Sequence, residues 1–140
     1  MQFRMNKALS TTDVLKLIKK DNYAWKTFLG VFPIDMLPII KKYPASAIIN
    51  TDPSYMSGEH WIAFYIDTAK RCVFFDSYGG APSTFDISGY LSDNSVNVSY
   101  NKYQFQGLTS SSCGYYCILF VRLICRGHTL NNITSVFSRK

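Results

Sequence analysis

The sequence predicts an α+β fold in which a small mixed β-sheet packs on one central buried helix. Two aromatic and β-branched segments, 60–67 and 71–78, are joined by a short polar turn, which is typical of a β-hairpin. Residues 113–126 are almost wholly apolar, with no glycine or proline after Gly114, which indicates a buried helix. With 140 residues, 47% of them hydrophobic, the chain suits a single domain (1–140) with one core.

The N-terminal third predicts one helix, a connection and a strand. Ser10 with an acidic residue three positions later, Asp13, is the pattern of a capping box, and apolar residues then recur at helical spacing until about Asp21. Residues 28–40 contain Gly30, Pro33 and Pro38, so we expect a compact connection with at most one helical turn. The run ASAIIN, 45–50, reads as a buried strand.

The remaining segments alternate between breakers and short elements. Residues 51–59 have the composition of a loop, and GGAPS interrupts the chain after the hairpin. A short helix is expected over 83–91 and another strand over 96–105. Gly127 ends the buried helix, and Thr129 begins a last amphipathic helix whose inward residues are Leu130, Ile133, Val136 and Phe137.

Charge is concentrated near the N-terminus. The net charge is +6, and residues 1–42 hold eight Lys or Arg against three Asp or Glu. This bias could face DNA or another polyanion, with Lys16, Lys19, Lys20, Lys41 and Lys42 as candidate contacts, or it could be an ordinary solvated surface. No apolar run reaches the roughly 18 residues of a membrane span, and no signal-peptide core is present. We therefore expect an intracellular, non-secreted protein with reduced cysteines.

Cys113 differs from the other cysteines in its position. It begins the buried helix after three serines, where free N–H groups and the helix dipole would stabilise a thiolate. Cys117 and Cys125 lie in the apolar body of the same helix, where a thiol stays protonated. Cys113 and Cys117 share a helix face, but neither histidine has zinc-motif spacing from them, so no metal site is expected.

A cysteine nucleophile needs a base and a group that orients the base. His128 follows the buried helix and would be about 20 Å from Cys113, so His60 is the candidate base. Across the hairpin, His60 faces residues 76–78, which makes Asp76 the expected partner, whereas Asp67 belongs to the opposite end. Oxyanion donors could be the Cys113 N–H and the side chain of Gln106, and spacing alone does not exclude Gln104.

These residues carry a resemblance to a known family. The order His60-Trp61, Asp76, Gln106 and Ser112-Cys113-Gly114, within GEHWIAFYID, CVFFDSYG and QFQGLTSSSCGYYCILF, resembles the adenovirus protease (adenain) family. That family shares a clan with the SUMO-specific proteases, and the resemblance spans about residues 25–126. Papain-type proteases run Cys, His, Asn instead.

The resemblance implies a catalytic set and a reaction. His60, Asp76 and Cys113 would form the triad of a cysteine endopeptidase, and the spacing to the cysteine favours Gln106 over Gln104 as oxyanion donor. Substrate-binding positions would be Gly58, Glu59, Trp61 and Gly114. The substrates would be viral capsid or precursor proteins cut after small residues, often glycine, in the virion or in the host nucleus or cytoplasm.

Activation is where the chain departs from these relatives. They are stimulated by DNA and by a viral peptide that is disulfide-linked to a cysteine upstream of the nucleophile, and residues 77–112 contain no cysteine. We expect a monomer that needs no cofactor, with DNA or a non-covalently bound peptide as candidate activators. The alternatives are a deubiquitinase-type or deSUMOylase-type deconjugating peptidase and a non-catalytic nucleic-acid-binding or capsid-binding relict.

Overall fold

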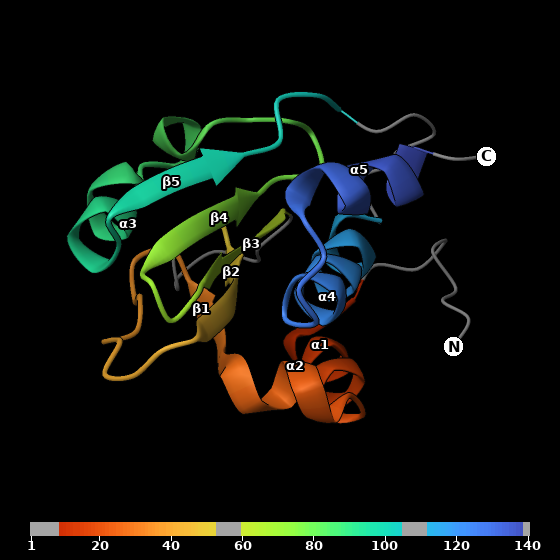
Figure 1. The fold of residues 1–140 in the computed structure, drawn as a ribbon. Coiled ribbons are helices and arrows are strands. Elements are labelled where there is room, and N and C mark those ends of the chain that lie inside the picture. Colours follow the sequence, from red (N-terminus) through yellow and green to blue (C-terminus); the bar gives the residue numbers. More distant parts are fainter. Residues whose placement is uncertain (1–8, 53–59, 105–111, 139–140) are drawn as a thin grey trace.

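A five-stranded mixed sheet forms the centre of the protein (Figure 1), in a computed structural model that describes residues 9–52, 60–104 and 112–138. The strands follow chain order: β1 (Phe28–Pro33), β2 (Ala45–Asn50), β3 (Trp61–Ile66), β4 (Arg71–Phe75) and β5 (Asn97–Tyr100). β2, β3 and β4 are antiparallel, while the outer strands β1 and β5 run parallel to their neighbours. The predicted α+β class with a mixed sheet is therefore confirmed.

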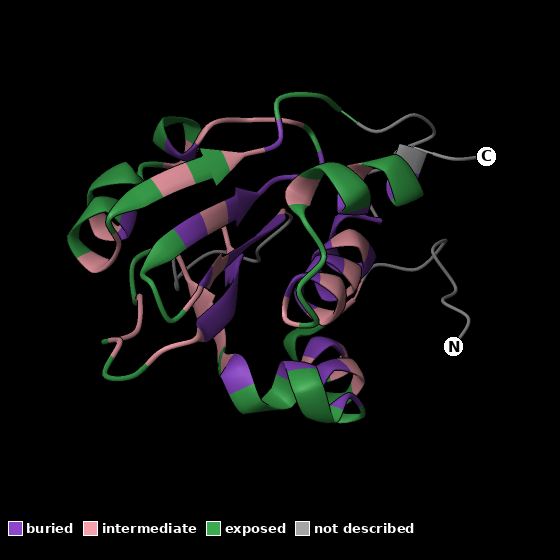
Figure 2. Cartoon of the chain, viewed as in Figure 1, coloured by how far each residue is buried: buried purple, intermediate pink, exposed green. Residues whose placement is uncertain are grey.

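Helices cover both faces of the sheet (Figure 1). On one face lie α1 (Thr11–Lys19), α2 (Asn22–Thr27), α4 (Cys113–Ile124) and α5 (Leu130–Ser138), with α4 directly against β3 and β2. The opposite face packs against α3 (Ser88–Asn94), next to the short 3₁₀ helix η1 (Pro82–Phe85). Figure 2 shows that β2, β3 and one side of α4 are the most buried parts. The buried central helix predicted from the sequence is present.

Alternation along the hairpin strands separates two apolar clusters. In β3, Trp61 and Ala63 point to the α4 side, and Ile62, Phe64 and Ile66 point to the α3 side. This is the period of two that a strand requires, and burial on both faces explains why the segment is apolar throughout.

One aromatic group ties the end of β4 to the helices. The ring of Phe75 stacks on Phe120 of α4, with centroids 4.9 Å apart and planes at 10°. The same ring meets Phe137 of α5 edge-on at 5.8 Å. Such pairs add about 0.5–1.5 kcal/mol each beyond the burial of their area. The last residue of β4 is thereby fixed relative to α4.

The helix start at Ser10 is confirmed, and so are the two long helices near the C-terminus, but Val136, which was expected to face inward, is exposed. Ser10 caps α1 through the Asp13 N–H at 3.1 Å, and the Asp13 carboxylate accepts the Ser10 N–H at 3.0 Å. α4 ends two residues before the predicted residue 126, and α5 follows a Thr129 side chain that accepts the Asn132 N–H at 3.2 Å. No described helix has the length and apolarity needed to cross a membrane.

The prediction for residues 28–40 was wrong in its first half. Residues 28–33 form β1, which pairs with β2 around an irregularity between Phe28 and Val31. Gly30 lies inside that irregularity at φ +140°, so the residue that suggested a turn instead serves a bulge. The helix α2 was not predicted, because its six residues are too few to show a period. The strand predicted at 96–105 is shorter, since β5 covers 97–100.

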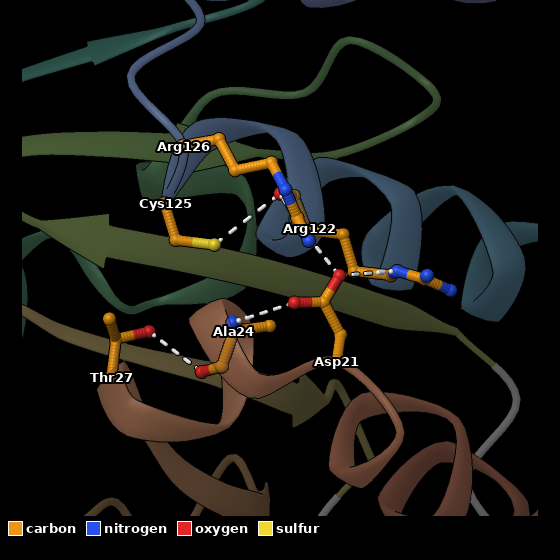
Figure 3. A network of polar contacts seen from close by, with 6 residues as sticks. All are labelled: Asp21, Ala24, Thr27, Arg122, Cys125 and Arg126. Carbon is orange, nitrogen blue, oxygen red and sulfur yellow. Dashed lines mark hydrogen bonds and ion pairs between the residues drawn. The ribbon is translucent and has the colours of Figure 1, made fainter.

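A buried carboxylate joins α2 to the end of α4 (Figure 3). Asp21 caps α2 through the Ala24 N–H at 3.1 Å, and its other oxygen accepts from Arg122 at 2.9 Å and Arg126 at 2.7 Å. Burial opposes the charge of Asp21, but the hydrogen bonds from Arg126, Ala24 and Arg122 outweigh burial and lower its pKa to about 2. The resulting stabilisation is complete above pH 3.8, the ordinary value, and is lost as the pH falls towards 2.

Removing this carboxylate should destabilise the fold. Asp21→Ala is expected to lower the free energy of unfolding by roughly 3 kcal/mol, because two arginines lose a buried partner. The exposed pair between Arg71 and Asp67 is the matched control, since the Arg71 side chain is 66% exposed. Arg71→Gln should cost less than about 0.5 kcal/mol. Urea denaturation measures both variants, and equal losses would contradict this account.

Candidate active site

Cys113 is the first residue of α4 and is only 2% exposed. Ser112 occupies the N-cap position, but its side chain makes no capping hydrogen bond. The capping role predicted for the serines therefore does not hold for Ser112, and Ser110 and Ser111 lie outside the described residues. A helix of twelve residues presents N–H groups and the positive end of its dipole beside the Cys113 thiol.

The hairpin brings His60 and Asp76 together, as its length predicted. Ala63 pairs with Phe75 in the register of β3 and β4, so the residues just before β3 and just after β4 meet at one end of the sheet. His60 Nε2 and Asp76 Oδ1 are 2.6 Å apart. The Asp76 side chain is 1% exposed and that of His60 is 19% exposed. Asp67, at the other end, bonds with Arg71 instead.

The imidazole of His60 links the carboxylate to the thiol. Burial would lower the pKa of His60, but hydrogen bonds to Asp76 and Cys113 and the attraction of both groups outweigh burial and raise its pKa to about 9. Since Nε2 faces Asp76, the other ring nitrogen is left for Cys113. The three side chains thus form one hydrogen-bonded series, and the histidine favours its charged form at neutral pH.

Backbone groups of the turn after β4 hold the Asp76 carboxylate. Oδ1 also accepts the Tyr78 N–H at 3.2 Å, and Oδ2 accepts the Gly80 N–H at 2.8 Å. A Cβ at position 80 would lie 2.7 Å from Oδ2, so this amide can approach only as glycine. Sequence reasoning treated the two glycines as a chain break and missed this role. Their position three and four residues after an acidic residue was the available signal.

Two aromatic rings flank His60 and were also missed. The ring centroid of Tyr78 is 4.9 Å from that of the imidazole, and the centroid of Phe85 is 5.7 Å away. Tyr78 is partly exposed, at 39%, beside this site. Packing of this kind restricts rotation of the imidazole and reduces its contact with water.

The predicted substrate-binding residues are only partly within the described chain. Trp61 and Gly114 are both buried, and a Cβ at Gly114 would lie 3.3 Å from Trp61 Cδ1 and 3.3 Å from Leu9 Cδ1. The space beside this glycine is therefore filled by Leu9 and Trp61, and a substrate contact at Gly114 stays a prediction. Gly58, Glu59 and Gln106 lie outside the described residues. Gln104 is described and exposed.

The other three cysteines are buried or partly buried in the protein, and His128 is exposed to solvent. Burial raises the pKa of Cys72 to about 12, that of Cys125 to about 11 and that of Cys117 well above its ordinary value. The four cysteines form no disulfide, and His128 is exposed beyond the far end of α4. Within the described ranges, no group of three or more His, Cys, Asp or Glu side chains could hold a metal ion.

Sequence comparisons place the chain near the adenovirus proteases. A family model described as adenovirus endoprotease matches residues 28–86, which include His60 and Asp76 but not Cys113. The protease of bovine adenovirus 2 is 28% identical over 91% of this chain and 73% of its own length. The protease of snake adenovirus serotype 1 is 31% identical over 80% of this chain and 63% of its own. The chain spans 61% to 73% of the length of the first three curated relatives.

Solved structures share the fold at low identity. A crystallised protease of ASFV superposes with a TM-score of 0.57 and 15% identity, covering 95% of this chain and 64% of that one. The central domain of an uncharacterized Legionella pneumophila protein gives a TM-score of 0.51 and 12% identity, covering 95% and 87%. These structures share the fold, and by sequence the chain is similar to viral proteases. Its relatives by sequence are the adenovirus endoproteases, as the resemblance predicted.

Titration of His60 tests the electrostatics of this site. Its imidazole should titrate near pH 9, and Asp76→Asn should move the midpoint towards the ordinary 6.5, because the largest charge-stabilising contact is removed. The stability gained from the charged imidazole is complete below pH 6.5 and is lost as the pH rises through about 9. NMR of the ring signals measures the midpoint, with His128→Gln to identify them.

Asp67→Asn is the matched control for this titration, because Asp67 lies at the opposite end of the hairpin and bonds with Arg71. It should leave the His60 midpoint unchanged. A midpoint near 6.5 in the unmodified protein would contradict the described geometry.

Proposed function

We propose that this protein is a cysteine endopeptidase in which Cys113 is the nucleophile, His60 the proton-transfer group and Asp76 the residue that orients His60. The observation that carries the proposal is the hydrogen-bonded series from Asp76 through His60 to the first residue of α4. The relationship to viral peptidases supports the same reaction. An intact series with a buried carboxylate also favours an enzyme over a non-catalytic relict.

The proton can be followed through the proposed reaction. With a pKa near 9, His60 is protonated at neutral pH and lies beside Cys113, the proposed nucleophile. Its sulfur attacks the scissile carbonyl carbon, and the imidazolium gives its proton to the leaving amine as the C–N bond breaks. Water attacks the resulting thioester, with neutral His60 taking a proton from the water. The Cys113 sulfur leaves as the C–S bond breaks, and the acid product and protonated His60 are formed.

Oxyanion stabilisation comes from two donors in this proposal. One is the N–H of Cys113 at the start of α4, and the other is the side chain of Gln106, carried over from the family resemblance. Gln106→Ala should lower kcat by roughly 10²–10³ with little change in KM, because the donor acts on charge present only in the transition state. Gln104→Ala is the matched control and should be mild, and the reverse ranking would exchange the two assignments.

The substrates follow from the family relationship. Viral proteases act on viral proteins, which suggests precursor or capsid substrates and a site of action in the virion or the host cell. We propose cleavage after small residues, often glycine, as the family resemblance implies. Gly58, Glu59, Trp61 and Gly114 remain the proposed substrate-binding positions. A peptide library digested with the whole protein would report the motif.

The nucleophile assignment has a direct test. Cys113→Ala should abolish peptide hydrolysis while the protein stays folded, since alanine suits a helix start and fills similar space. Cys117→Ala is the matched control, because Cys117 lies one turn along the same helix and is fully buried. It should keep the chemistry and lose only packing energy. Loss of hydrolysis in a folded Cys117→Ala protein would overturn the assignment, as would failure of a Gly-Gly vinyl sulfone to label Cys113.

Activation is proposed to be non-covalent. Lys16, Lys19 and Lys20, at the end of α1, and Lys41 and Lys42, in the connection after β1, are all exposed, and they remain the proposed DNA contacts. We expect basal hydrolysis in the presence of a reductant, without a thiol-linked peptide. Weak DNA binding should fall steeply as salt rises, because phosphate contacts release counterions.

A salt series with and without DNA separates these two claims. Changing the five lysines to glutamine should remove the DNA effect, whereas Lys70→Gln with Lys102→Gln should not. No hydrolysis until a thiol-linked peptide is added would contradict basal activity. No DNA affinity at low salt would leave the basic region an ordinary solvated surface.

A further inference from the structure

Asn101 makes an unusual contact with the backbone of Asp76. It follows β5 and is buried, with 6% of its surface exposed. Its Nδ2 donates to the Asp76 carbonyl at 2.7 Å, and its Oδ1 accepts the Asp76 N–H at 3.3 Å. One side-chain amide thereby pairs with both polar backbone groups of a single residue, 25 positions earlier in the chain.

The sheet explains why this contact is needed. β4 and β5 run parallel, and their last registered pair is Phe74 with Tyr100. Asp76 therefore lies beyond the ladder, yet it is buried, so its N–H and carbonyl require partners other than water. The side chain of Asn101 supplies them at the place where the next backbone partner would stand. The Gly79 N–H adds a second donor to the same carbonyl at 2.8 Å.

The turn after Asp76 also fits closely on the chain after β5. Asn101 Nδ2 reaches the Tyr103 carbonyl at 3.5 Å, and a Cβ at Gly79 would lie 2.8 Å from the Tyr103 carbonyl carbon. Gly79 has φ +79°, which favours glycine. Since the Tyr78 and Gly80 amides that hold the carboxylate belong to this turn, the backbone of Asp76 and its carboxylate are fixed together.

We propose that Asn101 is a positioning residue for the Asp76–His60 pair, holding the acid's backbone so that its carboxylate stays directed at the imidazole. The inference rests on the proposed peptidase function for its kinetic consequence, but its structural consequence can be measured without it. Displacement of a catalytic group by about 1 Å can cost 10²-fold in rate. Loss of the two hydrogen bonds from Asn101 should therefore lower kcat and weaken the contact between Asp76 and His60, while substrate binding changes little.

Asn101→Leu removes both hydrogen bonds at similar volume, and Asn101→Gln keeps the uncharged amide on a side chain one methylene longer. We expect kcat to fall roughly 10- to 100-fold in Asn101→Leu and less in Asn101→Gln, with KM within about threefold. The NMR midpoint of His60 should fall in the same order, which a merely structural role would not produce. Asn97→Leu is the matched control, because Asn97 is an exposed asparagine at the start of β5, the strand that Asn101 follows.

The outcomes are distinguishable. A lower His60 midpoint in the Asn101 variants without any hydrolysis by the unmodified protein would support the positioning role and refute the peptidase. A fall in kcat with an unchanged His60 midpoint would overturn the positioning role and leave the proposed peptidase function intact. Values of kcat within twofold of the unmodified protein would have the same meaning. If Asn101→Leu does not fold, Asn101→Gln decides by the same two readouts.

Discussion

The packing of α4 on the β3–β4 hairpin is the constraint on which the site depends. The hairpin carries His60 and Asp76 at its open end, and α4 carries Cys113 at its first residue. The stacked rings of Phe75 and Phe120 lie between them, and Phe75 is the residue directly before Asp76. A shift of the helix along the sheet would therefore separate the thiol from the imidazole before it disturbed the pair on the hairpin. In this fold, core packing determines the geometry on which the proposed chemistry relies.

At this site, burial and hydrogen bonding have opposite effects on the pKa of His60, and hydrogen bonding together with charge attraction has the larger effect. Removing an imidazole from water disfavours its charge, yet His60 has a raised pKa because a buried carboxylate lies 2.6 Å away. That carboxylate is itself stabilised by the Tyr78 and Gly80 amides. Asp21 solves the same problem at the other end of α4 with two arginines and an N–H group. The two buried carboxylates differ in their partners. Asp21 pairs with arginines, which stay charged, whereas Asp76 pairs with the titratable ring of His60.

How much the sequence predicts depends on whether a feature has a period or a fixed length. The hairpin and α4 have a clear pattern over many residues, and the hairpin length alone paired His60 with Asp76. β1 has no such pattern, since Gly30 and Pro33 resemble turn residues and the pairing with β2 is irregular. The six residues of α2 are too few for a helical period. The contact of Asn101 with Asp76 joins residues 25 positions apart, so no local sequence pattern reveals it.

Solved structures with only 12–15% identity share this fold. An apolar helix must begin beside the open end of a hairpin, and the turn after that hairpin must expose its amides inward. The body of α4 meets the first requirement with residues that keep Cys117 inert, while its first residue meets a charged ring. One helix thus provides both the dry core and the charged end of the site. Cys113 and Cys117 are the same residue four positions apart, so position rather than residue type separates them: Cys113 lies at the helix start beside His60, and Cys117 lies in the apolar body of the helix.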